Sequence, residues 1–280
     1  MNKIVSLAVA GAIVLWAGAA SAQTKWDLPA GYPPSNFHSK NLVAFADDVR
    51  QATGGKLDIR VHAGASLFKV PEIKRAVQTG QAQIGELLMS NMENEDAVFG
   101  VDVVPFLVTS YDESAKLWKA ARPVIEKKLA AQGLTLLYAV PWPPQGIYAN
   151  KELNTIEDMK GLKFRAYNPG TARIAELVGA QPVTIQAAEL AQALATGVVN
   201  SFISSGSTGR DSKVWEALSH FYDTQAWLPY NVIFANSAAF NALDDATKKA
   251  LRDAAAKAEA RGIEMSKEEM NDALDALRKN

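Results

Sequence analysis

The chain has 280 residues, of which 48% are hydrophobic and 21% are charged, and 29 Lys and Arg face 30 Asp and Glu. This composition is typical of a globular protein with one large or two modest domains, and it excludes disordered and collagen-like chains. A net charge of -1 supplies no basic field for nucleic acid or anionic lipid. Because cysteine is absent, thiol catalysis, disulfides, zinc–thiolate sites and iron–sulfur clusters are excluded.

The first 22 residues have the pattern of a secretory signal peptide. Lys3 precedes an apolar run over about residues 4–19, and small residues at 20–22 come before Gln23. The run is short for a transmembrane helix, and no later segment reaches the roughly 18 apolar residues that a second span requires. We therefore expect cleavage after Ala22 and a mature protein in the periplasm.

From residue 25 onward, short apolar runs alternate with amphipathic segments, an order typical of a layered α/β fold. Strands are expected at the apolar runs, residues 57–61, 82–89, 134–140, 146–150, 162–167, 182–185 and 199–204. Helices are expected at the amphipathic segments, residues 42–53, 71–79, 117–129, 171–178, 187–196 and 243–279. Gly54-Gly55 ends the first helix, Pro123 is a possible kink in the third, and Gly262 is a weak point in the last.

The segment from Pro141 to Gly146 contains three prolines and a glycine, which argue against helix or central strand. We interpret it as a crossing between two lobes. Residues 23–142 then form mainly lobe 1 and residues 143–225 mainly lobe 2. Residues 226–280 are expected to supply return strands and C-terminal helices that pack across lobe 1.

Signatures of catalysis are scarce in this sequence. The three histidines have no metal-binding spacing, and no phosphate-binding loop or nucleophile elbow is present, so we expect no cofactor and no metal. One enzyme alternative remains, a periplasmic hydrolase that uses Ser205 or Ser207 with His220. A structural or adhesive exported protein is a third class, which small molecules would not stabilise.

An arginine interrupts an otherwise apolar strand at residues 162–167. Strand alternation places Lys163, Arg165 and Tyr167 on one face. Two alternatives follow for Arg165. It could face solvent on an edge strand, or its guanidinium could lie at a cleft and bind a carboxylate through paired hydrogen bonds, with Asn168 as a neutral donor beside it.

Several segments resemble the DctP-like solute-binding proteins of the tripartite ATP-independent periplasmic (TRAP) transporters. The similar segments are residues 54–57, 65–68, 154–165, 179–185 and 189–200. The resemblance covers essentially the whole mature chain. It implies an α/β, two-lobe fold like that of periplasmic binding proteins, crossed by strands and carrying a long C-terminal helix. Such a hinged trap closes on an organic acid and delivers it to the small and large permease subunits.

The resemblance also implies that Arg165 anchors a carboxylate, with Asn168 in the same site. Where family members that bind sialic acid carry a second arginine, this chain has Gln145, and Ala187 stands where some members have an aromatic residue. We therefore favour an aromatic or a 2-oxo or 2-hydroxy monocarboxylate as ligand. A C4-dicarboxylate or a sugar acid is the alternative, and Glu86 could serve a dicarboxylate or polyol.

The other candidate ligand contacts are aromatic residues for an apolar wall, small hydroxyls after the lobe 2 strands, and polar residues or methionine near strand ends in lobe 1. Ordinary core packing is the alternative for each aromatic residue. These candidates are Trp142, Tyr148, Tyr167, Trp227, Ser204, Ser205, Asn36, His38, Met89 and Ser90.

Overall fold

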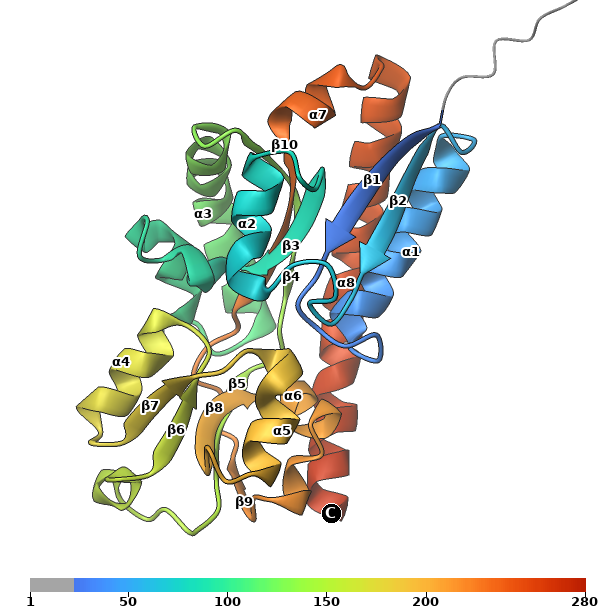
Figure 1. Ribbon diagram of the computed structural model, residues 1–280. Coiled ribbons are helices and arrows are strands. Elements are labelled where there is room, and N and C mark those ends of the chain that lie inside the picture. Colours follow the sequence, from blue (N-terminus) through green and yellow to red (C-terminus); the bar gives the residue numbers. More distant parts are fainter. Residues whose placement is uncertain (1–22) are drawn as a thin grey trace, which may run out of the picture.

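The computed structural model describes residues 23–280, so the signal-peptide prediction lies outside the described residues. The fold is α/β with two lobes, as expected, and the lobes lie one above the other in Figure 1. Lobe 1 holds a two-stranded sheet of β1 and β2 and a three-stranded sheet in the order β3-β10-β4. Its strands are β1 (Thr24–Pro29), β2 (Leu57–His62), β3 (Ile84–Leu88), β4 (Leu134–Pro141) and β10 (Tyr230–Asn236).

Lobe 2 holds one five-stranded sheet in the order β7-β6-β8-β5-β9. Its strands are β5 (Gln145–Ala149), β6 (Lys163–Ala166), β7 (Gln181–Thr184), β8 (Ser201–Ser205) and β9 (His220–Tyr222). β6 pairs in parallel with both β7 and β8. It is therefore an inner strand, and the alternative that placed Arg165 on an edge strand facing solvent is wrong.

Helices cover the sheets of both lobes (Figure 1). Lobe 1 carries α1 (Phe37–Ala52), α2 (Val70–Gln78), α3 (Tyr111–Ala130) and α7 (Ser237–Ala242), with short 3-10 turns η1 (Met89–Met92) and η2 (Ala97–Val103). Lobe 2 carries α4 (Pro169–Leu177), α5 (Leu190–Ala195) and α6 (Gly206–Asp211), with 3-10 turns η3 (Ile156–Met159), η4 (Ala187–Glu189) and η5 (Val214–Glu216). The helix expected over 187–196 is thus a turn followed by a short helix. α1 starts earlier than expected, because the Asn36 side chain caps its first turn.

Two chain segments cross between the lobes and pair with each other. One leads from β4 to β5, and the other leads from β9 to β10. Trp142 N donates to Pro229 O at 2.7 Å, and Gln145 N donates to Trp227 O at 3.0 Å. The prolines predicted to mark a crossing therefore lie at the junction of the two sheets.

The helix α8 (Asp245–Lys279) runs along both lobes (Figure 1). It contacts α1 and β4 of lobe 1 and α6 of lobe 2, so it extends beyond the lobe 1 packing expected for residues 226–280. It also continues through Gly262, where we expected a weak point. A Cβ atom there would lie 2.5 Å from Val140 Cγ2 and 2.7 Å from Asn41 Nδ2. The glycine therefore permits close packing of α8 on lobe 1.

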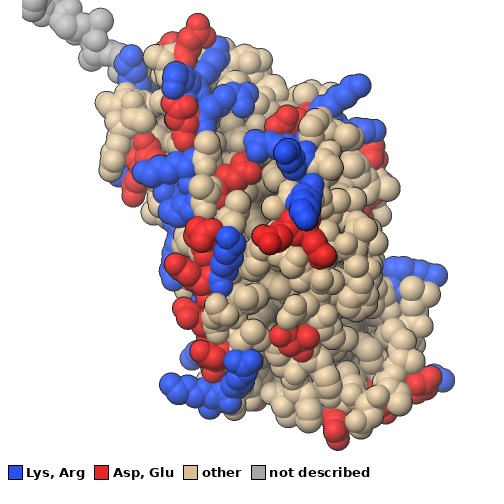
Figure 2. Space-filling view, turned by 180° about the vertical axis from the view of Figure 1, so that it is seen from behind, with Lys and Arg blue, Asp and Glu red and all other residues tan. Residues whose placement is uncertain are grey.

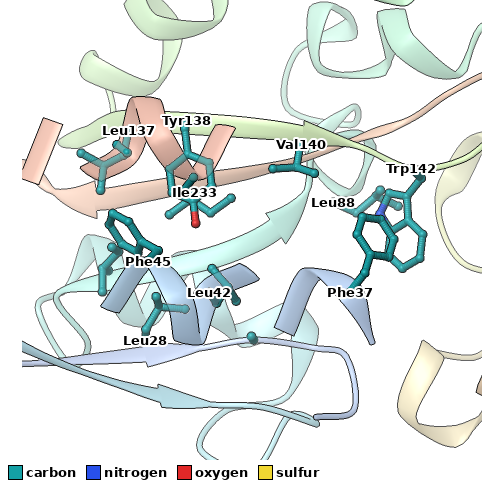
Figure 3. Packing of buried hydrophobic residues seen from close by; sticks show 14 of the residues in the cluster. Leu28, Phe37, Leu42, Phe45, Leu88, Leu137, Tyr138, Val140, Trp142 and Ile233 are labelled. Carbon is teal, nitrogen blue, oxygen red and sulfur yellow. The ribbon is translucent and has the colours of Figure 1, made fainter. Parts of the chain in front are cut away.

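The largest buried core connects α1 with the sheets of lobe 1 and continues into lobe 2. Figure 3 shows Phe45, Tyr138 and Ile233 packed together, and Phe37 against Trp142 further along. The Phe37 and Trp142 rings meet edge to face, with centroids 5.3 Å apart. Each such fully buried side chain contributes roughly 1.5–3 kcal/mol. This core holds Trp142 rigidly at the crossing between the lobes.

The surface carries mixed charge. On the face seen in Figure 2, blue and red residues interleave, and neither sign forms a broad field. Within residues 23–280, no helix has the length and hydropathy that a membrane crossing demands. That same part of the chain has no cluster of three His, Asp or Glu side chains arranged to hold a metal ion.

Candidate functional site

A small cavity lies between the two lobes. Its volume is about 40 Å³, and one buried water requires about 10–15 Å³, so the space suits a compact ligand. Side chains from both lobes and from the crossing segments line it. They are Gly31, Tyr32, Val70, Glu86, Leu87, Leu88, Asn91, Trp142, Gln145, Arg165, Tyr167, Gln186, Ala187, Ser204, Thr208 and Pro229.

Arg165 is the only arginine or lysine in this lining. The residue is 3% exposed and belongs to β6, an inner strand of the lobe 2 sheet. Its Nε donates to Ile185 O at 2.8 Å, and its Cζ lies 5.0 Å from the centre of the Tyr167 ring. Among the described residues, no carboxylate forms an ion pair with it. Burial lowers the pKa of Arg165 to about 10.

A buried cation without a counter-ion destabilises a folded protein unless an anion binds beside it. The guanidinium of Arg165 uses only Nε for the main chain, so its two terminal nitrogens remain for a ligand. Their planar fork matches the two oxygens of a carboxylate. The arrangement is therefore chemically suited to an organic anion.

A second polar group of the cavity is centred on Glu86, which is 1% exposed on β3. Asn231 Nδ2 donates to Glu86 Oε1 at 2.9 Å. Asn231 Oδ1 in turn accepts hydrogen bonds from Trp142 Nε1 at 2.9 Å and from the Tyr32 hydroxyl at 3.3 Å. Burial raises the pKa of Glu86 to about 7. The cavity therefore combines one cation with one carboxyl group.

Tyr167 and Gln145 are held by a chain of hydrogen bonds. Trp227 Nε1 donates to the Tyr167 hydroxyl at 3.1 Å, and this hydroxyl donates to Gln145 Oε1 at 3.3 Å. Gln145 Nε2 donates to Pro143 O at 3.0 Å. These contacts fix the orientation of the two lining side chains without a ligand.

Five of the candidate residues from the sequence line the cavity. They are Trp142, Gln145, Arg165, Tyr167 and Ser204. They come from three places that are distant in the sequence: the first crossing, β6 with the residue that follows it, and β8. The fold brings them together because the strands of lobe 2 end at the same edge as the crossing.

Two candidates lie behind the lining. The His38 ring centroid is 4.3 Å from that of Trp142, and His38 Nδ1 lies 3.6 Å from Glu86 Oε1. Burial lowers the pKa of His38 well below its ordinary value, so the ring is neutral. Trp227 donates to Tyr167 and does not line the cavity. Both residues support the wall of the site from the core side.

Three further candidates lie in the cores of the lobes rather than at the cavity. Tyr148 stacks on Phe202 with ring centroids 4.4 Å apart, and its hydroxyl donates to Ser205 O at 3.0 Å. Ser205 Oγ accepts from Thr208 N at 3.3 Å and caps α6. Met89 is fully buried in lobe 1. Strand alternation and helix capping direct these side chains away from the cavity.

The last three candidates make hydrogen bonds between the lobes. Asn168 Nδ2 of lobe 2 donates to Ser90 Oγ of lobe 1 at 2.8 Å. Asn36 Nδ2 of lobe 1 donates to Asp211 Oδ2 of lobe 2 at 2.7 Å. Asn168 also caps α4, since its Oδ1 accepts from Thr171 N at 2.8 Å. None of the three lines the cavity. Their hydrogen bonds between the lobes hold the lobes in a closed arrangement.

No local signal in the sequence points to several of the lining residues, notably Asn91, Gln186 and Thr208. Two other lining residues do carry a local signal. Tyr32 follows the end of the first strand, where ligands bind in α/β folds. Glu86, which the sequence already offers for a dicarboxylate or polyol, is a carboxylate within an otherwise buried strand. Asn91 and Gln186 carry no such signal, because each lies in a loop or short turn that only the folded chain brings to the cavity.

The residues considered for a serine hydrolase are not joined by the described contacts. His220 Nδ1 lies 2.8 Å from Ser219 Oγ, and His220 starts β9 at the edge of the lobe 2 sheet. Ser205 is engaged in capping α6, and Ser207 Oγ is buried with no partner within residues 23–280. Among the described contacts, neither Ser205 nor Ser207 therefore pairs with His220.

Comparison with solved structures shows strong similarity over both lobes. The chain is 58% identical to DctP6 of Bordetella pertussis, an extracytoplasmic solute receptor that binds pyroglutamic acid, with a TM-score of 0.90 over 91% of this chain and 85% of that one. It is 50% identical to a marine metagenome TRAP solute-binding protein specific for pyroglutamate, with a TM-score of 0.90 over 92% and 84% of the two chains.

Comparison of sequences points the same way. The C4-dicarboxylate-binding periplasmic protein DctP of Rhodobacter capsulatus is 26% identical over 257 residues, which are 88% of this chain and 74% of that protein. The model of the DctP family, described as bacterial extracellular solute-binding protein, family 7, matches residues 31–280. The chain therefore belongs to the DctP family and is a solute-binding protein of the TRAP transport systems.

Proposed function

We propose that this protein captures pyroglutamate, the five-membered lactam of glutamate, in the periplasm. The observation that carries the proposal is the buried guanidinium of Arg165, which lines the cavity and has no counter-ion among the described residues. A ligand carboxylate supplies that counter-ion. The two similar proteins with 58% and 50% identity bind pyroglutamic acid, which is a monocarboxylate.

The chemistry of the lining favours a small monocarboxylate over the other ligands considered. With Arg165 as its only arginine or lysine, the lining offers one anion site, and a second carboxylate of a C4-dicarboxylate would lie close to Glu86. A sugar acid is larger than pyroglutamate and needs a partner for each of its hydroxyl groups, which a small cavity accommodates less well. An aromatic ring, which the sequence favours, brings no hydrogen-bond donor to the buried carboxyl group of Glu86. A five-membered ring with one carboxylate fits these constraints.

Delivery to a membrane permease completes the proposed role. We propose that residues 1–22 are removed after Ala22 and that the mature chain hands its ligand to the small and large permease subunits. Contacts made by both lobes stabilise only the closed state, so ligand binding shifts the protein toward the form that a permease can distinguish.

Calorimetric titration of the mature chain tests this proposal. The chain is unfolded and refolded first to remove any retained ligand, and pyroglutamate, succinate, galacturonate and phenylpyruvate are then compared. We expect pyroglutamate to bind with a Kd of roughly 1 μM or below and the other acids at least about 100-fold more weakly. Tighter binding of any of the other three would overturn the assignment of the ligand.

Two arginine variants test the anchor. Arg165→Ala removes the buried cation, and we expect it to weaken pyroglutamate binding by about 100-fold or more. Arg173→Ala is the matched control, because Arg173 is an exposed arginine of α4 that pairs with Glu176. Equal affinity of Arg165→Ala and the wild type would exclude Arg165 as the anchor.

A further inference from the structure

One oxygen of the Glu86 carboxyl group has no hydrogen-bond partner. Glu86 Oε1 accepts from Asn231, whereas Oε2 is buried and unpartnered within residues 23–280. The residue lines the same cavity as Arg165. A buried acceptor without a donor is costly, so a ligand that brings a donor to this oxygen gains affinity there.

Within residues 23–280, no second side-chain donor and no charged cation contacts Glu86. Asn231 Oδ1 is occupied by donors from Trp142 and Tyr32, so the amide of Asn231 turns its N–H toward Glu86. His38 Nδ1 lies 3.6 Å from Oε1, beyond a normal hydrogen bond, and burial keeps its ring neutral. The network therefore fixes Glu86 Oε1 as an acceptor and leaves Oε2, an acceptor when the carboxyl group is ionised, without a donor among the described residues.

We infer that Glu86 determines specificity by accepting a hydrogen bond from the ring N–H of a ligand whose carboxylate is bound by Arg165. The inference rests on the proposed function and names the ligand class more closely, as cyclic acids that carry an N–H donor beside the carboxylate-bearing carbon. A ring oxygen at the same place would repel the Glu86 carboxylate, because both groups are hydrogen-bond acceptors. Discrimination of this kind is large, because the mismatched ligand leaves a buried polar group unpaired.

A pair of ligands with almost the same shape tests the inference. 5-Oxotetrahydrofuran-2-carboxylate is the lactone that corresponds to pyroglutamate, with a ring oxygen in place of the N–H. Titration calorimetry at pH 8 gives the ratio of the two Kd values for each variant. We expect the wild type to bind the lactam about 100-fold more tightly than the lactone. For Glu86→Gln we expect the lactam to bind at most about 10-fold more tightly than the lactone, because a glutamine amide can turn its own N–H toward the lactone oxygen.

Asp102→Asn is the matched control. Asp102 is also a buried carboxyl group of lobe 1, but it does not line the cavity, and its Oδ2 accepts from Tyr230 N at 2.7 Å. We expect this variant to keep the wild-type ratio. A wild-type ratio near 1 overturns the inference even if Glu86→Gln does not fold.

The outcomes separate this inference from the proposed function. If the wild type binds the lactam and the lactone equally, or if Glu86→Gln keeps the wild-type ratio, Glu86 does not select the N–H and pyroglutamate remains the ligand. If the wild type binds neither ligand while another acid binds, the proposed function itself is wrong.

Discussion

Two buried residues of opposite charge line the same small cavity, and both are incompletely paired. Arg165 has no carboxylate partner among the described residues, and Glu86 has one free oxygen. Burial opposes the charged form of each, which lowers the pKa of Arg165 and raises that of Glu86. Such residues weaken the unliganded fold, and a ligand with a matching carboxylate and donor removes that cost.

The buried carboxyl group makes stability depend on pH. Glu86 is surrounded by Asn231, His38, Tyr32 and Tyr138, and none of these carries a positive charge. Burial raises its pKa from 4.5 to about 7, so the folded protein holds this proton more tightly than the unfolded chain does. The stabilisation that comes from protonated Glu86 is fully present below pH 4.5 and is lost as the pH rises through about 7.

Glu86→Gln should remove this dependence. Relative to the wild type, we expect the free energy of unfolding of the ligand-free variant to increase between pH 4.5 and pH 8 by about 3 kcal/mol. Urea unfolding at the two pH values gives the difference. The comparison between variants is needed because the pKa of the buried Asp102 is also raised, to about 8. A constant difference between the two proteins would show that Glu86 ionises as freely in the fold as in the unfolded chain.

The geometry of the guanidinium, and not only its charge, should govern affinity. Arg165→Lys keeps a cation in the cavity but replaces the planar fork with a single ammonium group. We expect pyroglutamate to bind this variant about 10-fold more weakly than the wild type, and still more tightly than Arg165→Ala. Titration calorimetry measures both. A lysine as effective as the arginine would show that charge alone anchors the ligand.

Among the elements, the N-terminus of α4 joins lobe 2 to lobe 1. Pro169 begins the helix, and Gly170 N donates to Glu93 Oε1 across the cleft. A Cβ atom on Gly170 would lie 3.3 Å from the same carboxylate oxygen. Burial raises the pKa of Glu93, and the hydrogen bond from Gly170 at the positive end of the helix offsets part of that effect. Glu93 therefore links the two lobes without lining the cavity.

Glu93→Gln should therefore speed opening. We expect pyroglutamate to dissociate roughly 3- to 10-fold faster, because the helix N-terminus loses its negative partner. Stopped-flow tryptophan fluorescence measures the rate. Glu95→Gln is the control, since Glu95 pairs with Lys74 inside lobe 1. Equal dissociation rates for both variants would mean that the Glu93 contact does not limit opening.

The long helix α8 depends on a glycine for its contact with lobe 1. In an exposed helix, Gly→Ala stabilises by about 1 kcal/mol. At Gly262 the added Cβ would lie 2.5 Å from Val140 Cγ2, so we expect Gly262→Ala to destabilise by about 1–3 kcal/mol. Urea unfolding measures the change. Ala256→Gly, at an exposed position of α8, should cost about 1 kcal/mol. A more stable Gly262→Ala protein would show that α8 can shift away at no cost.

At the scale of the whole molecule, two paired crossing segments and α8 connect the lobes. Hydrogen bonds between Asn168 and Ser90 and between Asn36 and Asp211 hold the lobes together around the cavity. A ligand that touches both lobes adds its binding energy to the closed form alone. The free energy of unfolding of the whole protein should therefore increase when the ligand binds.

Pyroglutamate should raise the melting temperature of the mature protein. At 1 mM ligand and a Kd of about 1 μM, linkage adds about 4 kcal/mol and raises Tm on the order of 10 °C. Differential scanning calorimetry measures the shift, and Arg165→Ala, with its weaker binding, should show about a third of that shift or less. An equal shift in that variant would place the binding outside the cavity of Arg165.

The sequence by itself determined the fold class and the order of most elements, because apolar periodicity and glycine or proline punctuation act locally. Gly54 and Gly55 adopt positive φ angles of 58° and 80° just after α1, as the end of that helix requires. It also singled out Arg165, because a charged residue in an apolar strand is conspicuous without any knowledge of its neighbours.

Only the tertiary structure decided which side chains share the cavity. Asn168, Ser90 and Asn36 are polar residues near element ends, and their place between the lobes depends on how lobe 2 meets lobe 1. Likewise, the sequence predicts a weak point at Gly262, whereas the close contact with Val140 makes a glycine necessary there. Such roles depend on contacts between residues up to about 200 positions apart, which no local pattern in the chain encodes.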